Sequence, residues 1–460
     1  MPAVAQAIAT DTFRFDKVKS LPKSATNVHL IVLVHGWMGN PTELGYLEKA
    51  LEKESNAKLT RECSADGDGV KIDGQDNPVE DVAVLVHSAT SNDGKTMDGI
   101  EAGGTRLAKE VNALIQDVAE YYSNDEASWK ASPCKAAKPN LSLSFVGNSL
   151  GGLYARYALS QIPMSVHRGE REVTITPKMF CTTATPHLGV SEHTYLPIPR
   201  VAEYVVANVM QPTGRDLFRY TDVIERITVD PTFVNPLLQF EKRVAWANAY
   251  STDFQVPTAT AAFLADIDSV HKTIVDSPIL KKRPKQSSSE IESQGDAGNG
   301  NDDDDDDDVV DDDDDHFVAL VVKTPQTISS LETNECCKDI SNSEIARRLD
   351  SFGWTKVFCD VRDRLPSVPL PRLFFSPPKP STAGDNQSGG TSRSYTSREL
   401  KTSFAVSVLR WGERFHVPLG HTVLVANSKN DVYASLNAGG QPIMDHLAED
   451  LVREVLTGNS

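Results

Sequence analysis

Apolar runs of strand length alternate with segments of helical spacing along the chain. Continuous apolar runs occupy residues 28–35, 82–86 and 179–184. Such runs are typical of parallel strands that are buried on both faces, because neither face of the strand meets water. Residues 100–122 carry apolar side chains at helical spacing and predict a crossover helix. This alternation predicts an α/β fold, with a mostly parallel central sheet and helices on both of its faces.

Further strands are expected on both sides of the middle of the chain. The runs at 141–146, 244–249, 354–361 and 404–409 have the length and composition of strands. Together with the segments above they fit one domain over residues 24–455, since α/β folds often exceed 250 residues as a single unit.

Two stretches interrupt this rhythm. Residues 281–316 pass from a basic triplet through Ser, Gln and Gly to runs of aspartate, and residues 376–398 are rich in Pro, Ser, Gly and Thr. Neither can bury enough apolar surface to offset the entropy of ordering it. We predict a disordered acidic insertion at 281–316 and a flexible insertion at 376–398. The aspartate runs are interpreted as a solvated loop rather than a site for Ca²⁺ or a basic partner.

The net charge of −18 comes largely from one place. Twelve aspartates lie at 302–308 and 311–315, and removing twelve charges from −18 leaves −6 for the rest of the chain. Without a basic stripe, nucleic-acid binding has no electrostatic basis.

Cysteine usage and the N-terminal residues suggest a cytoplasmic protein. The six cysteines, at 63, 134, 181, 336, 337 and 359, form no C-x-x-C pair, which fits a reducing compartment and predicts no metal site. Residues 1–17 lack the basic and apolar regions of a secretory signal, and no run is long enough to span a membrane. Any membrane contact is expected to be peripheral.

The strongest chemical signal is the G-x-S-x-G turn at residues 147–151. It follows the strand at 141–146 and leads into a helical segment at 152–159. Glycines two positions either side of Ser149 permit a turn so tight that the hydroxyl is displayed at the sheet edge. Strand, turn and helix in this order are the context of a nucleophilic serine in an α/β-hydrolase. We predict Ser149 as the nucleophile.

A nucleophilic serine also needs two N–H donors for the oxyanion that forms on attack. In this fold one is the residue after the nucleophile, here Leu150, and the other comes from the loop after an upstream strand. That loop, at 35–40, contains two glycines that let its backbone approach a substrate. We predict Trp37 as the second donor, with Met38 as the alternative.

The catalytic acid is expected after the strand at 244–249, because the order in this fold is Ser, then Asp or Glu, then His. Asp253 is the only carboxylate in the loop at 250–257 and is predicted to be the acid. Three aspartates that precede the strand are weaker candidates: Asp216, Asp222 and Asp230.

The base must follow the acid, which leaves five histidines: His271, His316, His416, His421 and His446. His421 is predicted to lie in a loop after the last strands and before the final helix, where this fold places its base. His416 is the next candidate, ahead of His446 on an amphipathic helix. His35 and His187 precede the acid and are interpreted as structural.

At these residues the sequence resembles the eukaryotic "putative serine esterase" family of lipase-like proteins, the ROG-type lipases. The resemblance rests on blocks at 32–39, 96–108, 145–152, 183–189, 243–253 and, more thinly, 420–423. It implies an α/β-hydrolase fold and a hydrolase of acyl esters, often of lipids, that needs no cofactor. One departure is the separation of Asp253 from His421 by 168 residues.

Three points stay open at this stage. Apolar residues within 190–240 could form a lid that docks on a lipid surface or could be ordinary core. Acyl transfer to an acceptor other than water would use the same residues as hydrolysis. A non-catalytic scaffold that binds a basic partner through the acidic insertion is the remaining alternative.

Overall fold

The computed structural model describes most of the expected domain. The described residues are 13, 15–65, 82–123, 140–168, 171–191, 200–250, 252–265, 317–332, 340–369, 410–411, 414–417 and 419–457. The two predicted insertions at 281–316 and 376–398, the predicted strand at 404–409, and His271 and His316 lie outside them.

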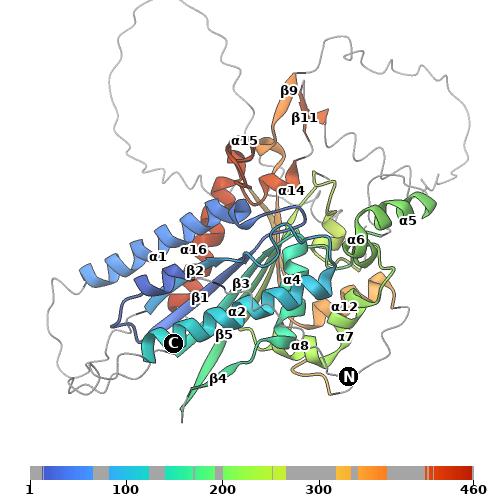
Figure 1. The fold of residues 1–460 in the computed structure, drawn as a ribbon. Coiled ribbons are helices and arrows are strands. Elements are labelled where there is room, and N and C mark those ends of the chain that lie inside the picture. The colour runs from blue at the N-terminus through green and yellow to red at the C-terminus, as the bar shows by residue number, and fades with distance from the viewer. Residues whose placement is uncertain are drawn as a thin grey trace, which may run out of the picture.

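A mostly parallel sheet forms the centre of the molecule (Figure 1). Its strands run in the order β2-β1-β3-β5-β6-β8-β7, with β4 paired to β5. Pairing is parallel from β2 through β8, and β7 is antiparallel to β8. The bounds are β1 Asn27–Val34, β2 Val82–Ser88, β3 Asn140–Asn148, β4 Ser165–Arg168, β5 Arg171–Thr183, β6 Lys242–Asn248, β7 Val318–Lys323 and β8 Thr355–Cys359.

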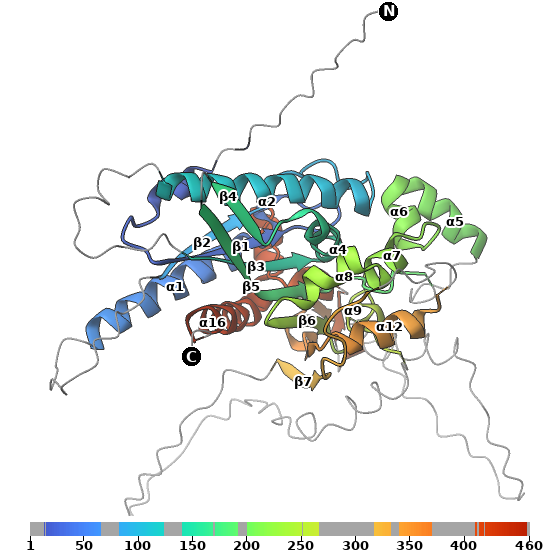
Figure 2. The ribbon, with the colours of Figure 1, turned by 90° about the horizontal axis from the view of Figure 1, so that it is seen from below.

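Helices cover both faces of this sheet (Figure 2). On one face lie α2 (Ile100–Ser123), α4 (Leu150–Ala158), α7 (Val223–Val229), α8 (Pro231–Leu238) and α12 (Asn342–Ser351). On the other face lie α1 (Gly45–Ala65) and α16 (Gln441–Thr457). The mostly parallel sheet with helices on both faces that the hydrophobic pattern predicted is thereby confirmed, and strand, serine turn and helix follow in the order of the α/β-hydrolase fold.

Alternating side chains of β1 build the two halves of the core. Val28, Leu30 and Val32 are buried with α2 and α4. Ile31 and Leu33 point to the other face and are buried with α1 and α16. Burial on both faces explains why this strand reads as a continuous apolar run rather than an alternating one.

Several strands differ in length or direction from the prediction. β5 begins at Arg171, earlier than the expected 179, because its first half pairs with β4 as an antiparallel ribbon. β7 was not predicted. A small second sheet, β10-β11-β9, contains β9 (Ser367–Pro369), β10 (Arg410–Trp411) and β11 (Arg414–His416). These short pieces depend on tertiary contacts and have little hydrophobic pattern of their own.

The segment at 190–240, for which a lid and ordinary core both stayed open, contains α5 (Arg200–Val209), α6 (Gln211–Leu217), α7 and α8. Ile224 on α7 and Val234 on α8 are fully buried in the main core. In contrast, Tyr204, Val205 and Val209 on α5 are exposed, Val209 by 72%. The side chains of α7 and α8 therefore belong to the core, whereas α5 exposes apolar side chains on the surface and is the better candidate for a lid.

Candidate active site

Ser149 occupies the sharp turn between β3 and α4. Its backbone has φ 53° and ψ −126°, a strained conformation that a non-glycine residue adopts only when its surroundings enforce it. Its N–H donates to the Thr183 carbonyl at 2.8 Å. A side chain at Gly151 would approach the Val34 carbonyl oxygen to 2.2 Å, so the turn can pack against β1 only with glycine there. These contacts hold the serine at the carboxyl edge of the sheet.

The loop after β1 lies directly against this serine. A Cβ atom at Gly36 would come within 2.8 Å of the Ser149 Cβ atom, so glycine is required for the approach. The Met38 N–H, the alternative donor to the oxyanion, instead donates a hydrogen bond to Thr96 Oγ1 at 3.0 Å. The Leu150 N–H belongs to the first turn of α4, where backbone N–H groups have no acceptor within the helix. Trp37 and Leu150 thus stay the predicted donors.

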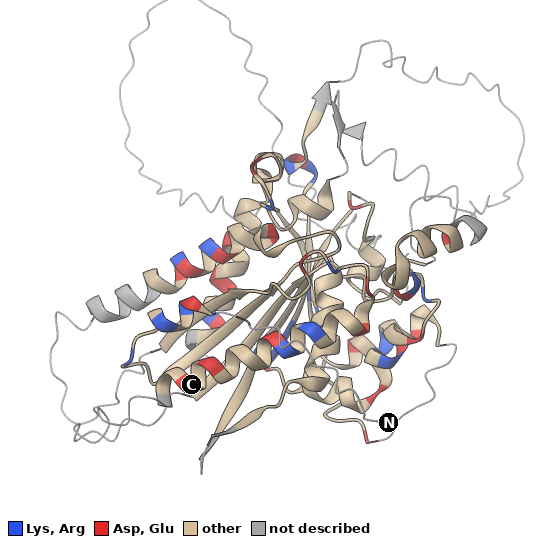
Figure 3. Cartoon of the chain, in the orientation of Figure 1, with Lys and Arg blue, Asp and Glu red and all other residues tan. Residues whose placement is uncertain are grey.

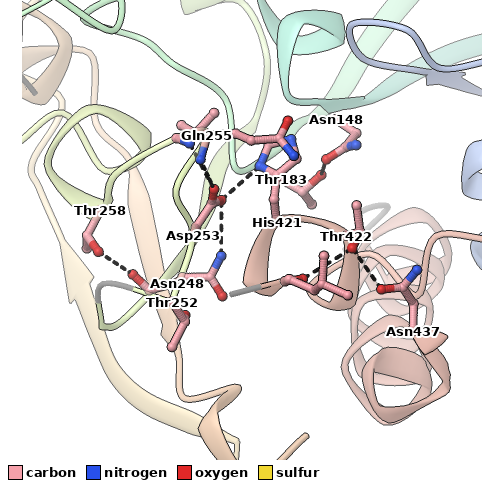
Figure 4. A network of polar contacts seen from close by, with 12 residues as sticks. Asn148, Thr183, Asn248, Thr252, Asp253, Gln255, Thr258, His421, Thr422 and Asn437 are labelled. Atoms are coloured by element: carbon pink, nitrogen blue, oxygen red, sulfur yellow. Dashed lines mark hydrogen bonds and ion pairs between the residues drawn. The ribbon is translucent and has the colours of Figure 1, made fainter. Parts of the chain in front are cut away.

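Asp253 lies in the loop after β6 and is almost fully buried. Its Oδ1 atom accepts hydrogen bonds from the backbone N–H groups of Gln255, at 2.9 Å, and Val256, at 2.8 Å. Its Oδ2 atom accepts from the Asn248 side chain at 3.3 Å and contacts His421 Nδ1 at 2.8 Å (Figure 4). The carboxylate is therefore fixed on several sides, with one oxygen aimed at the histidine.

His421 belongs to the one-turn helix α14 (Gly420–Val423). The prediction of a loop at this position was wrong, because residues 420–423 close a helical turn in which the Leu424 N–H donates to the Gly420 carbonyl. The imidazole is buried, 6% exposed. Thr422 anchors the turn by donating to Asn437 Oδ1 at 2.8 Å (Figure 4).

Backbone contacts join the acid and base segments across 168 residues of sequence. Asp253 and Leu419 form an isolated antiparallel bridge. The Gly420 N–H donates to the Thr252 carbonyl at 3.0 Å. The contact between Asp253 and His421 is thus supported by the main chain on both sides.

The pKa of His421 is raised above its ordinary value of 6.5. Burial alone would lower this pKa, but the charge and hydrogen bond of Asp253 and the charge of Glu43 favour the protonated ring. With Nδ1 held by Asp253, Nε2 is the ring nitrogen free to accept a proton. Within the described residues the Ser149 hydroxyl makes no hydrogen bond to His421, and such catalytic contacts commonly tighten only when substrate binds.

The other predicted acids have contacts elsewhere. Asp216 accepts from the Ile100 N–H at 2.7 Å at the start of α2. Asp222 occupies the N-cap position of α7, and Asp230 caps α8 by accepting from the Thr232 N–H at 2.8 Å. None of the three contacts His421 in the described part of the chain.

The other histidines after the acid whose backbone is described belong to β11 and α16. His416 ends β11. His446 projects from α16 and packs edge-on against Trp246 and Phe317.

Two upstream histidines have contacts of a structural kind. His35 Nδ1 lies 3.1 Å from the Gly36 carbonyl oxygen, at the start of the loop after β1. His187 is fully buried, 3.1 Å from Thr182 Oγ1 and 3.4 Å from the Arg156 guanidinium. Burial and the nearby Arg156 charge lower the pKa of His187 well below 6.5, so its ring is neutral.

Sequence reasoning did not single out Glu43. This residue lies in the short 3₁₀ helix η2 (Pro41–Leu44) and is only 4% exposed. Its Oε1 atom accepts hydrogen bonds from the Gly36 N–H at 2.9 Å and from the Asn148 side chain at 2.6 Å. Its place in a short helix after the loop gives no local sign that it is buried against Gly36 and Asn148.

Two further properties concern the described residues only. They contain no group of three or more His, Cys, Asp or Glu side chains arranged to hold a metal ion. None of their helices combines the length and apolar character needed to cross a bilayer. Figure 3 shows acidic and basic residues interspersed along α1 and α2.

Comparison with curated proteins gives relatives in yeasts. The chain is 29% identical over 248 residues to "Putative lipase C4A8.10" of Schizosaccharomyces pombe, covering 51% of this chain and 26% of the relative. It is 28% identical over 242 residues to "Putative lipase ROG1" of Saccharomyces cerevisiae, covering 51% of this chain and 28% of the relative. The chain therefore spans only about a quarter of the length of these relatives.

Solved structures match more distantly. Phospholipase PlaB from Legionella pneumophila, solved in complex with thio-NAD, matches with 12% identity and a TM-score of 0.24, covering 50% of this chain and 41% of that one. The lin2722 product of Listeria innocua matches with 14% identity and a TM-score of 0.24, covering 56% of this chain and 96% of that one.

A family model covers the part of the chain that contains the loop after β1, the serine turn and the acid. The model described as "Putative serine esterase (DUF676)" matches residues 24–264, more than half of the 460 residues. The family resemblance stated from the sequence is thereby confirmed, and the chain belongs to the family described as "Putative serine esterase (DUF676)".

Proposed function

We propose that this protein is a serine hydrolase that cleaves carboxylic esters through Ser149, His421 and Asp253. The observation that carries the proposal is the 2.8 Å contact between His421 Nδ1 and Asp253 Oδ2 at the edge of the sheet where the serine turn lies. Membership of a family described as serine esterases supports the same reaction.

In the first half of the reaction, Ser149 Oγ attacks the ester carbonyl carbon while His421 Nε2 takes the hydroxyl proton. Asp253 holds the ring in the tautomer that leaves Nε2 free and stabilises the imidazolium that results. The N–H groups of Trp37 and Leu150 bind the oxyanion. His421 then gives its proton to the departing alcohol as the ester C–O bond breaks, which leaves an acyl group on Ser149.

In the second half, water attacks the acyl-enzyme and gives a proton to His421. Collapse of the second tetrahedral intermediate breaks the bond to Ser149 Oγ, which recovers a proton from His421. The acid product leaves, and the free enzyme is restored.

The substrate class proposed is acyl lipids. Two curated relatives carry the name lipase. In addition, α5 presents exposed Tyr204, Val205 and Val209, which suit contact with an apolar surface. We propose that α5 belongs to a lid beside the active site and that contact with lipid is peripheral.

A fluorophosphonate probe tests the proposal directly, because it reacts with activated serine nucleophiles. We expect the full chain to be labelled, Ser149→Ala to be unlabelled, and p-nitrophenyl ester hydrolysis to disappear in the same variant. Equal labelling of both proteins, or no labelling of the unmodified chain, would contradict it. A release of acyl product only when an alcohol acceptor is added would indicate a transferase instead.

A further inference from the structure

We propose that Glu43 is a positioning residue of this esterase site. Its carboxylate holds the oxyanion loop against the nucleophile turn, and its charge stabilises the protonated base during turnover. This inference rests on the function proposed above and assigns a role to a residue outside the triad.

The first support is the geometry of the carboxylate. One oxygen, Oε1, accepts from the Gly36 N–H on the oxyanion loop and from the Asn148 side chain, the residue immediately before the nucleophile. The side chain is 4% exposed, so water competes little for these hydrogen bonds. A single atom therefore links the two backbone segments whose separation defines the oxyanion site.

The second support is that the neighbouring residues are fitted to this carboxylate. A Cβ atom at Gly39 would lie 2.0 Å from Glu43 Oε2, so the loop encloses the carboxylate only because glycine is there. Thr183 donates to Asn148 Oδ1 at 3.0 Å, which turns the amide NH₂ toward Glu43 (Figure 4 shows the Thr183 and Asn148 pair).

The third support comes from the base. The Glu43 main-chain carbonyl accepts from the Ser428 N–H at 3.1 Å, in the segment that follows α14. The charged groups acting on the His421 ring are Asp253, from the loop after β6, and Glu43, from η2, and both favour its protonated form. No lysine or arginine forms an ion pair with Glu43 among the described residues. The negative charge of Glu43 therefore adds to that of Asp253 in favouring the imidazolium that forms during catalysis.

The test compares Glu43→Gln with the unmodified full chain on a dissolved p-nitrophenyl ester. We expect kcat to fall about 10- to 100-fold with KM nearly unchanged, because misplacement of catalytic groups by a fraction of an ångström costs rates of this order. We also expect the acidic midpoint of the kcat/KM profile to move to lower pH, since a negative charge that favours protonated His421 is lost.

Two further variants separate charge, geometry and folding. Asn148→Ala removes the link to the nucleophile turn but keeps the charge, so kcat should fall without the shift in midpoint. Glu225→Gln removes another buried carboxylate, one on α7 that pairs with Arg219, and should leave both kcat and the midpoint unchanged. Thermal melting of each variant reports on folding.

The inference is overturned if Glu43→Gln keeps the midpoint of the unmodified chain, or if its loss of kcat is matched by Glu225→Gln at equal melting temperature. If Glu43→Gln does not fold, full kcat in both Asn148→Ala and Glu43→Asp, whose shorter side chain keeps the charge but withdraws the carboxylate from Gly36 and Asn148, overturns the positioning role. Failure of the unmodified chain to react with a fluorophosphonate would instead overturn the proposed function itself.

Discussion

Gly420 and Thr252 lie so close that no side chain fits between them. A Cβ atom at position 420 would meet the Thr252 carbonyl oxygen at 2.6 Å, while the Gly420 N–H donates to that same oxygen at 3.0 Å. This approach brings the residue after Gly420, His421, to the residue after Thr252, Asp253. Packing of two backbones therefore fixes the distance between base and acid.

Substitution of Gly420 by alanine should separate the two segments. We expect Gly420→Ala to reduce kcat at least about tenfold, because His421 moves relative to both Asp253 and Ser149. KM should change little, since position 420 faces Thr252. Steady-state kinetics on a dissolved ester, with melting temperature measured in parallel, check this. Full kcat in a variant that has lost thermal stability would show that the close approach is not needed.

Replacement of Asp253 by asparagine should remove the charge that favours protonated His421. We expect kcat to fall by about 10² to 10⁴, since the wrong histidine tautomer becomes available. The pKa of His421 is raised by Asp253, so the acidic limb of the residual activity should move to lower pH. A pH–rate profile measures both effects.

The matched control for this prediction is Asp230→Asn. Asp230 caps α8, and asparagine caps helices about as well as aspartate. Its activity should stay within about twofold of the unmodified chain. If the two variants lose activity equally, Asp253 has no special role.

His29 should make the fold sensitive to acid. The ring is buried on β1, 3.0 Å from Ser144 Oγ, and burial together with the charge of Lys178 lowers its pKa to about 3 from 6.5. Between these values the unfolded chain binds a proton that the folded chain does not. The free energy of unfolding should therefore fall by about 1.4 kcal/mol for each pH unit below 6.5 from this group alone.

Urea unfolding at several pH values tests the role of His29. His29→Gln should give a shallower dependence of the free energy of unfolding on pH between about 6 and 4, whatever its stability at neutral pH. Parallel curves for the two proteins would mean that His29 does not titrate as its burial implies.

The exposed face of α5 should matter only at a lipid surface. Val205→Ser combined with Val209→Ser is expected to lower hydrolysis of an emulsified long-chain ester by up to about 30-fold, because about 1 kcal/mol of apolar contact is lost per side chain. Hydrolysis of a dissolved short-chain ester should not change. Val321→Ser, on the edge strand β7 and 47% exposed, is the control that should affect neither substrate. Equal losses on both substrates would contradict the role of α5 as a docking surface.

The central sheet could be predicted from the sequence because its strands are buried on both faces. Strand-length runs rich in apolar residues at β1, β2, β3 and β6 have few alternative structures once turn residues bound them. The pairing of Asp253 with His421 was expected from the order of acid and base along the chain in this fold, although His421 follows β11 of the small antiparallel sheet and not a strand of the central sheet. Their catalytic roles, and those of Ser149, Trp37 and Leu150, stay predictions.

Other features depend on contacts between distant residues and left no local signal. β7 joins the sheet antiparallel to β8, and its alternating burial resembles that of many exposed strands. Glu43 left no sign because its two hydrogen-bond donors lie far from it or from each other in the sequence, Gly36 after β1 and Asn148 at the end of β3. The helical turn at His421 is only four residues long, too short for a periodic pattern.

The 168 residues between acid and base have a consequence for the order of folding. Bringing the ends of such a segment together costs roughly 4–5 kcal/mol of chain entropy, which must be recovered by contacts formed on either side. Contacts of high sequence separation generally form late on the folding pathway. The catalytic pair should therefore be assembled among the last native contacts, and ester hydrolysis should recover after helical circular dichroism during refolding from urea.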